Sequence, residues 1–524
     1  MLNYAQLAKN ASIIALFTAI SRITGLVRDI IIIHYFGASL SMDAFNIAFT
    51  IPNTLRNFVA EGALTAAFIP IYTETLKSSG SQIAKKFYQS VFGFLLIILI
   101  VLIFLGIIFA PYLVHAFANG FATRLEQINL TISLTRWIFC YIFFISLTAL
   151  SMSVLNSHKH FIIPAISPML FNIAMIVCVF AFYSYFENPI YALVIGVLIG
   201  GILQLVIQIP ILIKYKLFLL PKFNINTPYM NKFITATLPS VFGIIIYQLN
   251  IMSLRQIGSY LPVGQITYYS MADRLIQVPL GIFAVSIATA SLPTMSEHVL
   301  LDTKNNKALI EIWHFSTRLT TFIAIPAMFG LISIGLPIVS VLFYHGAYSW
   351  EATRMTANIM FALAPGLVAL SFSRTTIQAF YALRDIKTPI IISAIVLILN
   401  VIIAILMLKF ETIGLAISLT ISSFIQTCFL VFALKYKIGH LNIKQISYSV
   451  SLQIMLSLLM SVTVYCVCLF GDWNKGPTVF NATLLILSVI IGIATYVGLS
   501  LKLNLKETEI IKKFYRNYKS CKSN

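Results

Sequence analysis

The sequence predicts an all-helical protein that crosses a membrane many times. Of its 524 residues, 59% are hydrophobic and only 10% are charged, whereas a soluble globular protein carries about 25% charged residues. Apolar runs long enough to span a bilayer recur from one end of the chain to the other. We expect fourteen transmembrane helices, at approximately residues 12–34, 42–75, 88–113, 128–154, 161–185, 190–213, 233–256, 266–296, 311–335, 352–380, 389–408, 412–434, 447–470 and 478–501.

The basic charge of the chain follows this predicted topology. The net charge is +19, which by itself would be compatible with a nucleic-acid partner. When the N-terminus is placed in the cytoplasm, however, most Lys and Arg fall in inside loops and tails, and few fall in outside loops. We therefore expect both termini to be cytoplasmic and no nucleic acid to bind. The basic C-terminal tail is expected to lie on anionic lipid.

A weak internal repeat divides the first twelve spans into two halves. "AAFIPIYTE" (66–74) resembles "TASLPTMSE" (289–297), and "APYLVHAFANG" (110–120) resembles "LPIVSVLFYHG" (336–346). Pro164 matches Pro389 at almost the same offset. Because each half has six spans, the repeats run parallel, related by a pseudo-twofold axis along the membrane normal. We expect an N-lobe (1–216), a cytoplasmic linker (217–232), a C-lobe (233–440), two added helices (441–503) and a basic tail (504–524).

The second predicted span carries a polar stripe. Its polar residues recur every three or four positions and so share one face of a helix: Asp43, Asn46, Thr50, Asn53, Asn57 and Glu61. Arg56 lies just beyond the edge of this stripe. Hydrogen bonding within a packed bundle is the alternative, and it explains the Asn and Thr residues better than the charged ones. We favour a face that lines a cavity.

The first predicted span also contains charges. Arg22, Gly25 and Asp29 share a helical face, whereas Arg28 lies about 100° away from Asp29. An arginine at mid-membrane costs roughly 2.5–3.5 kcal/mol, so these side chains require partners or a function. We expect a bend or unwinding near Gly25 that brings Arg28 to the same face. An unbroken helix would instead make Arg28 a gate or interface residue.

Together these charges predict a cavity for an anion. The cationic candidates are Arg22, Arg28, Arg56 and Arg274, and the nearby acids are Asp29, Asp43, Glu61 and Asp273. Full internal pairing is the alternative. A guanidinium binds phosphate or carboxylate through two hydrogen bonds and stays protonated when desolvated. Gln277, Arg374 and Gln378 are candidates for the lining of the second lobe, whereas Arg136 and Arg318 are expected to snorkel or to pair.

The chain shows no sign of an enzyme. It contains no P-loop, metal-ligand cluster or nucleophile constellation, so we expect a transporter with no cofactor and no metal site. An ion gradient, the membrane potential or substrate flux must then supply the energy, with coupling to a monovalent cation or to the membrane potential as the candidates.

Four segments resemble the MurJ (MviN) lipid II flippases of the multidrug and polysaccharide exporter superfamily. They are "SRITGLVRD" (21–29), "MDAFNIAFTIPNTLRNFVAEGALTAAFIPIYTE" (42–74), "ADRLIQVPLGIFAVSIATASLPTMSE" (272–297) and "YALRDIKTP" (381–389). The resemblance implies alternating-access transport of lipid II, the undecaprenyl-pyrophosphate-linked peptidoglycan precursor, from the cytoplasmic to the periplasmic leaflet of the bacterial inner membrane. It assigns substrate binding to Arg22, Arg28, Arg56 and Arg274, and gate or charge-partner roles to Asp29, Asp43 and Glu61. Ser21, Asn53 and Asp273 are further candidates for gate or charge-partner roles.

The resemblance also implies a groove for the lipid tail beside the last two spans. Besides lipid II, the candidate partners are membrane lipids and the cell-division or elongation machinery. Three alternatives stay open at this point: a flippase for another lipid-linked saccharide, an ion-coupled drug exporter of the same superfamily, and a membrane scaffold that transports nothing. Drug exporters favour acidic and aromatic cavities, so the arginine cluster argues against the second of these.

Overall fold

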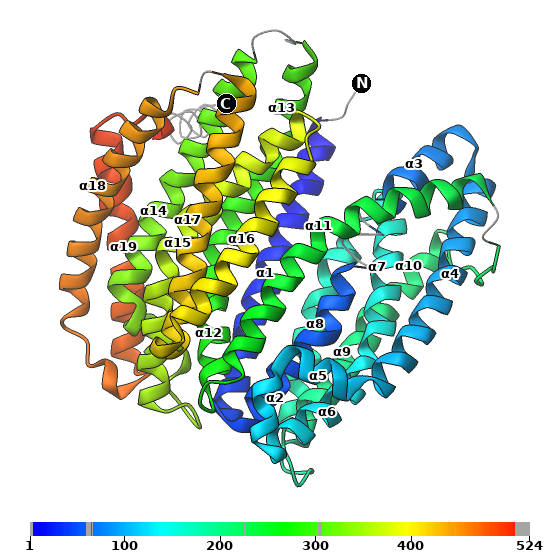
Figure 1. Cartoon of the computed structure of the whole chain (residues 1–524), viewed down its shortest axis with the longest axis horizontal. Coiled ribbons are helices and arrows are strands. Elements are labelled where there is room, and N and C mark those ends of the chain that lie inside the picture. The colour runs from blue at the N-terminus through cyan, green and yellow to red at the C-terminus, as the bar shows by residue number, and fades with distance from the viewer. Residues whose placement is uncertain are drawn as a thin grey trace, which may run out of the picture. The chain divides into compact units, whose positions relative to one another are not determined.

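The computed structural model describes residues 4–58, 64, 67–224, 227–301, 306–439 and 441–508, and these residues form helices and connecting turns without any strand. They divide into two compact units, residues 1–264 and 265–524. Figure 1 shows the helices by label.

In its described residues, the first unit contains eleven α-helices and one 3₁₀ turn. In chain order they are α1 (Tyr4–Phe36), α2 (Leu40–Asn57), α3 (Ile69–Ser78), α4 (Ser81–Ile108), α5 (Ala110–Ala118), η2 (Asn119–Thr123), α6 (Leu125–Phe139), α7 (Tyr141–Ser157), α8 (Ile162–Phe182), α9 (Tyr191–Val206), α10 (Ile209–Lys214) and α11 (Pro228–Gly258). The predicted repeat assigns α11 to the second lobe, whereas its packing places it in the first unit. The lobe boundaries stay a prediction.

The second unit contains eight α-helices in its described residues. They are α12 (Gln265–Pro279), α13 (Val285–Leu301), α14 (Lys307–Phe343), α15 (Trp350–Ala382), α16 (Lys387–Leu406), α17 (Glu411–Ile438), α18 (Ile443–Cys468) and α19 (Val479–Lys502). Short turns connect or follow them: the π-helical η3 (Leu280–Ala284) and the 3₁₀ turns η4 (Leu408–Phe410), η5 (Trp473–Lys475) and η6 (Lys506–Thr508). The last two long helices, α18 and α19, pack side by side (Figure 1).

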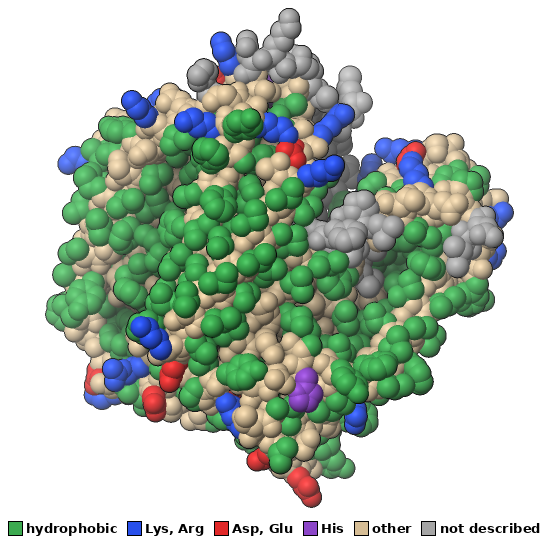
Figure 2. All heavy atoms as spheres, in the orientation of Figure 1, with side chains coloured by type: hydrophobic (Ala, Val, Ile, Leu, Met, Phe, Trp, Pro, Cys, Tyr) green, Lys and Arg blue, Asp and Glu red, His purple; other side chains and the backbone are tan. Residues whose placement is uncertain are grey.

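Eleven helical segments within the described residues are long and apolar enough to cross a membrane. They correspond to eleven of the fourteen predicted spans. The other three predicted spans fall on α1, on α2 with α3, and on α11. Figure 2 shows the expected outer surface of a membrane protein on the face in view: hydrophobic side chains cover the flanks of the helices, while Lys and Arg gather near their ends.

Three predicted spans are interrupted. The span expected at 42–75 contains α2 and α3, and the described residues between them, Phe58, Leu64, Ala67 and Phe68, are π-helical. Proline is tolerated in the first turn of a helix, where its missing N–H is not needed, and Pro70 occupies such a position in α3. The span at 128–154 is divided into α6 and α7 at Cys140, and the span at 266–296 is divided into α12 and α13 by η3.

Two turns that are 225 residues apart, close to the offset of the predicted repeat, have the same geometry. Lys159, after α7, and Arg384, after α15, both have positive φ, at 61° and 56°. The next residue in each case donates its N–H to a carbonyl five residues back: His160 to Leu155 and Asp385 to Phe380, both at 2.9 Å. This six-residue closure is a Schellman motif, which satisfies carbonyls at a helix C-terminus.

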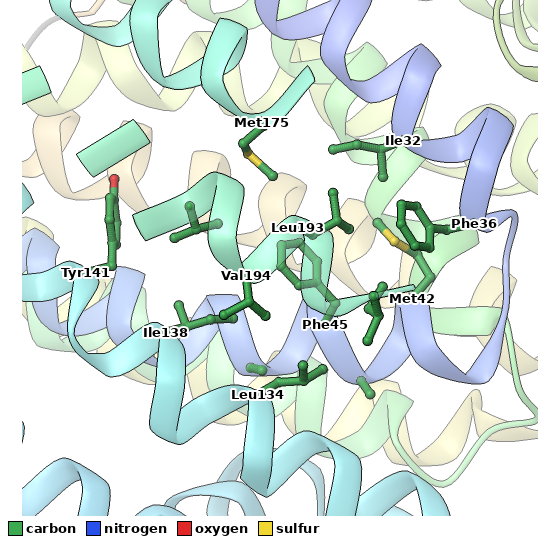
Figure 3. Packing of buried hydrophobic residues seen from close by; sticks show 14 of the residues in the cluster. Ile32, Phe36, Met42, Phe45, Leu134, Ile138, Tyr141, Met175, Leu193 and Val194 are labelled. Carbon is green, nitrogen blue, oxygen red and sulfur yellow. The ribbon is translucent and has the colours of Figure 1, made fainter. Parts of the chain in front are cut away.

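The core of the first unit fixes α1 against α2 and α8. Ile32 and Phe36 on α1 pack with Met42 and Phe45 on α2 and with side chains of α6, α8 and α9 (Figure 3). Gly200 on α9 allows close approach of α8, because a Cβ there would lie 2.7 Å from the Phe171 ring. Small residues permit such contacts between membrane helices. The polar residues of α1 are therefore held on a packed scaffold.

Candidate anion-binding site

The first helix of the site, α1, is α-helical without interruption from Tyr4 to Phe36. The unwinding expected near Gly25 does not occur. A break is unnecessary because the Arg28 side chain is long enough for its guanidinium to reach the carboxylate of Asp29, the next residue on the helix. Its Nη2 and Nε atoms donate to Asp29 Oδ1 at 2.7 and 3.1 Å. Both side chains are mostly buried, with 11% and 8% of their surface exposed. This geometry places Arg28 at the interface between α1 and α8.

The third partner in this cluster is Asn172 on α8. Its Oδ1 accepts a hydrogen bond from Arg28 Nη1 at 2.9 Å, and its Nδ2 donates to the Ser21 carbonyl and to Thr24 Oγ1, each at 3.2 Å. Asn172 therefore uses its whole amide group to connect α8 to α1. It was not among the predicted site residues. The available signal is an asparagine within an otherwise apolar span, a residue type that hydrogen-bonds between membrane helices.

The guanidinium of Arg56, at the end of α2, has different surroundings. Nη2 donates to Asn57 Oδ1 at 2.9 Å, whereas Nε is buried without a hydrogen-bond partner. Within the described residues no carboxylate forms an ion pair with Arg56. Leaving a buried donor of a charged group unsatisfied costs at least about 1–3 kcal/mol. An anionic oxygen placed against Arg56 would remove that cost.

Other predicted residues of the first unit fall in different environments. Arg22 is exposed on α1, and Asn53 is half-buried on α2. Asp43 is buried in the first turn of α2, where its Oδ2 accepts the backbone N–H of Gly264 at 2.6 Å. A carboxylate in this position is also stabilised by the helix dipole. Glu61 lies outside the described residues.

The predicted residues of the second unit lie on α12 and α15. Gln277 donates to Asp273 Oδ1 at 3.4 Å, one helical turn apart, and Arg274 is exposed beside them. On α15, Arg374 is half-buried, and Gln378 Oε1 is buried without a hydrogen-bond partner.

The two arginines expected to snorkel or to pair differ from each other. Arg318 on α14 forms an ion pair with Glu507 in η6, with Nε and Oε1 2.7 Å apart. Glu507 Oε1 also accepts from Ser449 on α18 at 2.7 Å. Pairing is thus confirmed for Arg318. Arg136 is exposed on α6.

Known proteins resemble the chain along most of its length. The family model described as lipid II flippase MurJ matches residues 32–484. The chain belongs to this family. A probable lipid II flippase MurJ of Buchnera aphidicola subsp. Schizaphis graminum is 33% identical over 466 residues, which cover 88% of this chain and 90% of the relative. A lipid II flippase MurJ of Burkholderia cenocepacia is 34% identical over 73% of this chain and 75% of its own length.

Solved structures agree with this assignment. A lipid II flippase MurJ in an inward closed conformation has a TM-score of 0.78 at 28% identity, and the match covers 94% of this chain and 99% of that one. A multidrug resistance MATE family transporter of the MOP superfamily, in an inward-facing conformation, reaches a TM-score of 0.65 at 14% identity over 82% of this chain and 98% of its own. The second likeness concerns the fold alone. The chain is an all-helical, multi-pass membrane protein of a transporter family.

Proposed function

We propose that this protein moves lipid II from the cytoplasmic to the periplasmic leaflet of a bacterial inner membrane by alternating access. Family membership supports the substrate class, because the relatives carry the name lipid II flippase. The observation in this chain that carries the proposal is Arg56, whose buried Nε has no partner. A pyrophosphate supplies anionic oxygens that match a guanidinium in charge and geometry.

The pyrophosphate is held in the first unit by Arg22 and Arg56, and by Arg28, which leaves its position at the interface of α1 and α8 when substrate binds. Arg274 on α12 is a further candidate for substrate binding. In the structure Asp29 occupies the fork of the Arg28 guanidinium. When substrate binds, a phosphate oxygen takes the place of the carboxylate, and after release Asp29 returns to it. Asp43, whose carboxylate accepts the Gly264 N–H in this structure, acts as a gate residue. The polyprenyl tail lies in a groove beside α18 and α19.

The remaining parts of the proposal concern energy, orientation and partners. A monovalent cation gradient or the membrane potential drives the cycle, and both termini face the cytoplasm. The protein works with the cell-division or elongation machinery. Valinomycin with external potassium collapses the membrane potential, whereas an electroneutral sodium–proton ionophore collapses the cation gradients. Applied separately to cells, they distinguish the two energy sources, because only the one that collapses the driving force stops transport.

The deciding experiment is a depletion and complementation assay in which lipid II exposed at the outer leaflet is measured directly. Arg56→Ala is expected to leave lipid II in the inner leaflet at normal protein level. Arg136→Ala, which removes an exposed arginine from α6, is the matched control and is expected to support growth. Normal outer-leaflet lipid II in Arg56→Ala would overturn the role of Arg56. Normal lipid II after depletion of the protein itself would overturn the proposed function.

A further inference from the structure

A second cluster of basic groups lies in the first unit, on other helices than the arginines of α1 and α2. It is built on the turn that ends α7. His158 Nε2 lies 3.0 Å from the Tyr72 hydroxyl on α3, and His160 Nε2 is buried without a hydrogen-bond partner. The ring of Tyr215, directly after α10, lies 6.1 Å from the His158 ring and 5.9 Å from the His160 ring, centroid to centroid.

Two lysines add positive charge to this turn. Burial lowers the pKa of both imidazoles, and the charge of Lys85 on α4 lowers that of His158 further. Lys214 at the end of α10 acts on His160 in the same way. Neither lysine has an ion pair in the part of the chain that the structure describes. On α3, which packs on α7, the acid Glu74 pairs instead with Lys232 at 2.6 Å.

The repeat shows what this cluster lacks. The second unit has the same Schellman turn, but Asp385 stands at the position of His160. Its Oδ2 pairs with Lys437, near the end of α17, at 2.5 Å, and it accepts a hydrogen bond from the Thr388 hydroxyl at 2.7 Å. Burial acts to raise the pKa of Asp385, but the bonds from Lys437 and Thr388 outweigh it and lower the pKa to about 2. The carboxylate is therefore the fixed anion of that turn.

Lys214 in the first unit corresponds to Lys437 in the second. These lysines are 223 residues apart, two fewer than the 225 residues that separate the two turns. The lysine is thus kept in both units, whereas the acid is replaced by a histidine whose ring nitrogen has no partner. Within the residues that the structure describes, the two lysines and two imidazoles of this site form no ion pair with a carboxylate, so the site is complementary to a mobile anion. Lysine binds phosphate as a compact point charge, and a protonated imidazole donates from both nitrogens.

We propose that the turn formed by His158 and His160, with Lys85 and Lys214, binds a phosphate group supplied either by an anionic phospholipid or by a free phosphate. The bound phosphate takes the place that the Asp385 carboxylate has in the second unit. This site is separate from the proposed lipid II site and does not depend on it. Its position between helix ends, among inside-loop lysines, puts it within reach of lipid headgroups.

Binding at this site depends on pH. Only protonated imidazoles add attraction for the anion, and both have a pKa lowered from 6.5 by burial and by the lysines. The bound anion stabilises the charged form and raises both pKa values again. By linkage, affinity for the anion must increase as the pH falls through the pKa values that the imidazoles have in the bound state.

The test uses the full-length protein with 3-fluorotyrosine in place of Tyr215, because this ring adjoins both imidazoles. The ¹⁹F signal follows their titration in nanodiscs of phosphatidylcholine, of phosphatidylcholine with added inorganic phosphate, and of phosphatidylglycerol. We expect the titration midpoint to rise by about one pH unit with at least one of the two anions. A rise in phosphatidylglycerol alone identifies a headgroup site, and a rise with phosphate alone identifies a site for the free anion.

Three variants make the test specific. His160→Asp recreates the arrangement of the second unit and is expected to abolish the response to both anions. Lys85→Gln is expected to weaken anion binding several-fold, whereas Lys86→Gln, which removes the same charge from an exposed neighbour on α4, leaves it unchanged. The proposal is overturned if neither anion moves the midpoint in the unsubstituted protein, or if His160→Asp and Lys86→Gln respond alike.

Discussion

Two buried ion pairs of the same type serve different purposes in this molecule. Arg28 pairs with Asp29, the next residue on the same helix, whereas Arg318 pairs with Glu507, which is 189 residues away. The N–O distance is 2.7 Å in both pairs, and the exposed fractions of their side chains are similarly low. Burial and pair geometry therefore do not distinguish them, but their connectivity does.

A pair within one helix adds little to tertiary structure, because both charges stay together whatever the neighbouring helices do. The Arg28 pair can therefore open toward a ligand without separating helices. The Arg318 pair joins α14 to η6, and Ser449 extends it to α18. Opening that pair would break the ionic link between α14 and η6. The first pair suits exchange with a substrate, and the second suits a permanent connection.

The largest expected effect comes from Arg28→Lys. The ammonium keeps the charge beside Asp29, so the melting temperature should stay close to that of the unsubstituted protein. It cannot reproduce the planar fork that bonds Asp29, Asn172 and a phosphate. We expect loss of growth in the depletion and complementation assay. Arg318→Lys is the matched substitution and should support growth, because a lysine can still pair with Glu507. Equal growth of the two variants would remove the functional distinction between the pairs.

The next largest effect is expected from Glu507→Ala. It leaves the Arg318 charge buried and unpaired, which costs about 3–5 kcal/mol. Thermal unfolding of the purified protein measures this, with Lys506→Ala, an exposed neighbour, as the control within about 0.5 kcal/mol. The double variant Arg318→Ala/Glu507→Ala should recover part of the loss, since it removes both charges. A melting temperature for Glu507→Ala equal to that of Lys506→Ala would show that the pair is not a structural connection.

The two pairs also show which features of the structure can be predicted from the sequence and which cannot. Apolar runs predict the spans well, because burial in lipid constrains every residue of a long segment. Arg318 was predicted to snorkel or to pair. The pairing was confirmed, but its partner Glu507 was not predicted. Nothing in the residues near 318 indicates Glu507, because their proximity is created by the packing of α14, α18 and α19. The hydrogen bond from the Gly264 N–H to the Asp43 carboxylate, between residues 221 apart, likewise arises from packing and was not predicted.

Arg28 shows a different limit of prediction, which arises within a single helix and not from packing between helices. Helical periodicity correctly separates the Cβ directions of Arg28 and Asp29 by about 100°, and from this we expected a break near Gly25. The arginine side chain is long enough to close that angle without one. A helical wheel places Cβ atoms, whereas ion pairs depend on the ends of flexible side chains. The contribution of Asn172 also required the structure, since it comes from another helix.

A smaller effect is expected from Asn172→Ala, which tests whether the Arg28 pair needs its anchor on α8. The substitution removes one acceptor and two donor interactions between α8 and α1. We expect a loss of about 1–3 kcal/mol in unfolding free energy and reduced but measurable growth. Ser167→Ala on the same helix removes a single buried hydrogen bond and should cost less. If Asn172→Ala cost no more than Ser167→Ala, the pair would be independent of α8.

The smallest effect is expected from Gly25→Ala, and it tests the continuity of α1 directly. A Cβ at this position would lie 3.5 Å from Asn172 Nδ2, an ordinary van der Waals contact. Alanine should therefore fit, and replacing glycine inside a helix should stabilise the protein by up to about 1 kcal/mol.

The comparison is Gly106→Ala on α4, where a Cβ would lie 1.9 Å from the Phe139 ring and should destabilise the fold. Thermal unfolding measures both variants, and the complementation assay gives the function of Gly25→Ala. Retained growth with raised stability means that transport works with an unbroken helix. Loss of growth at raised stability would show that α1 must bend at Gly25 during the cycle, so that the exchange at Arg28 would need more than the movement of its side chain.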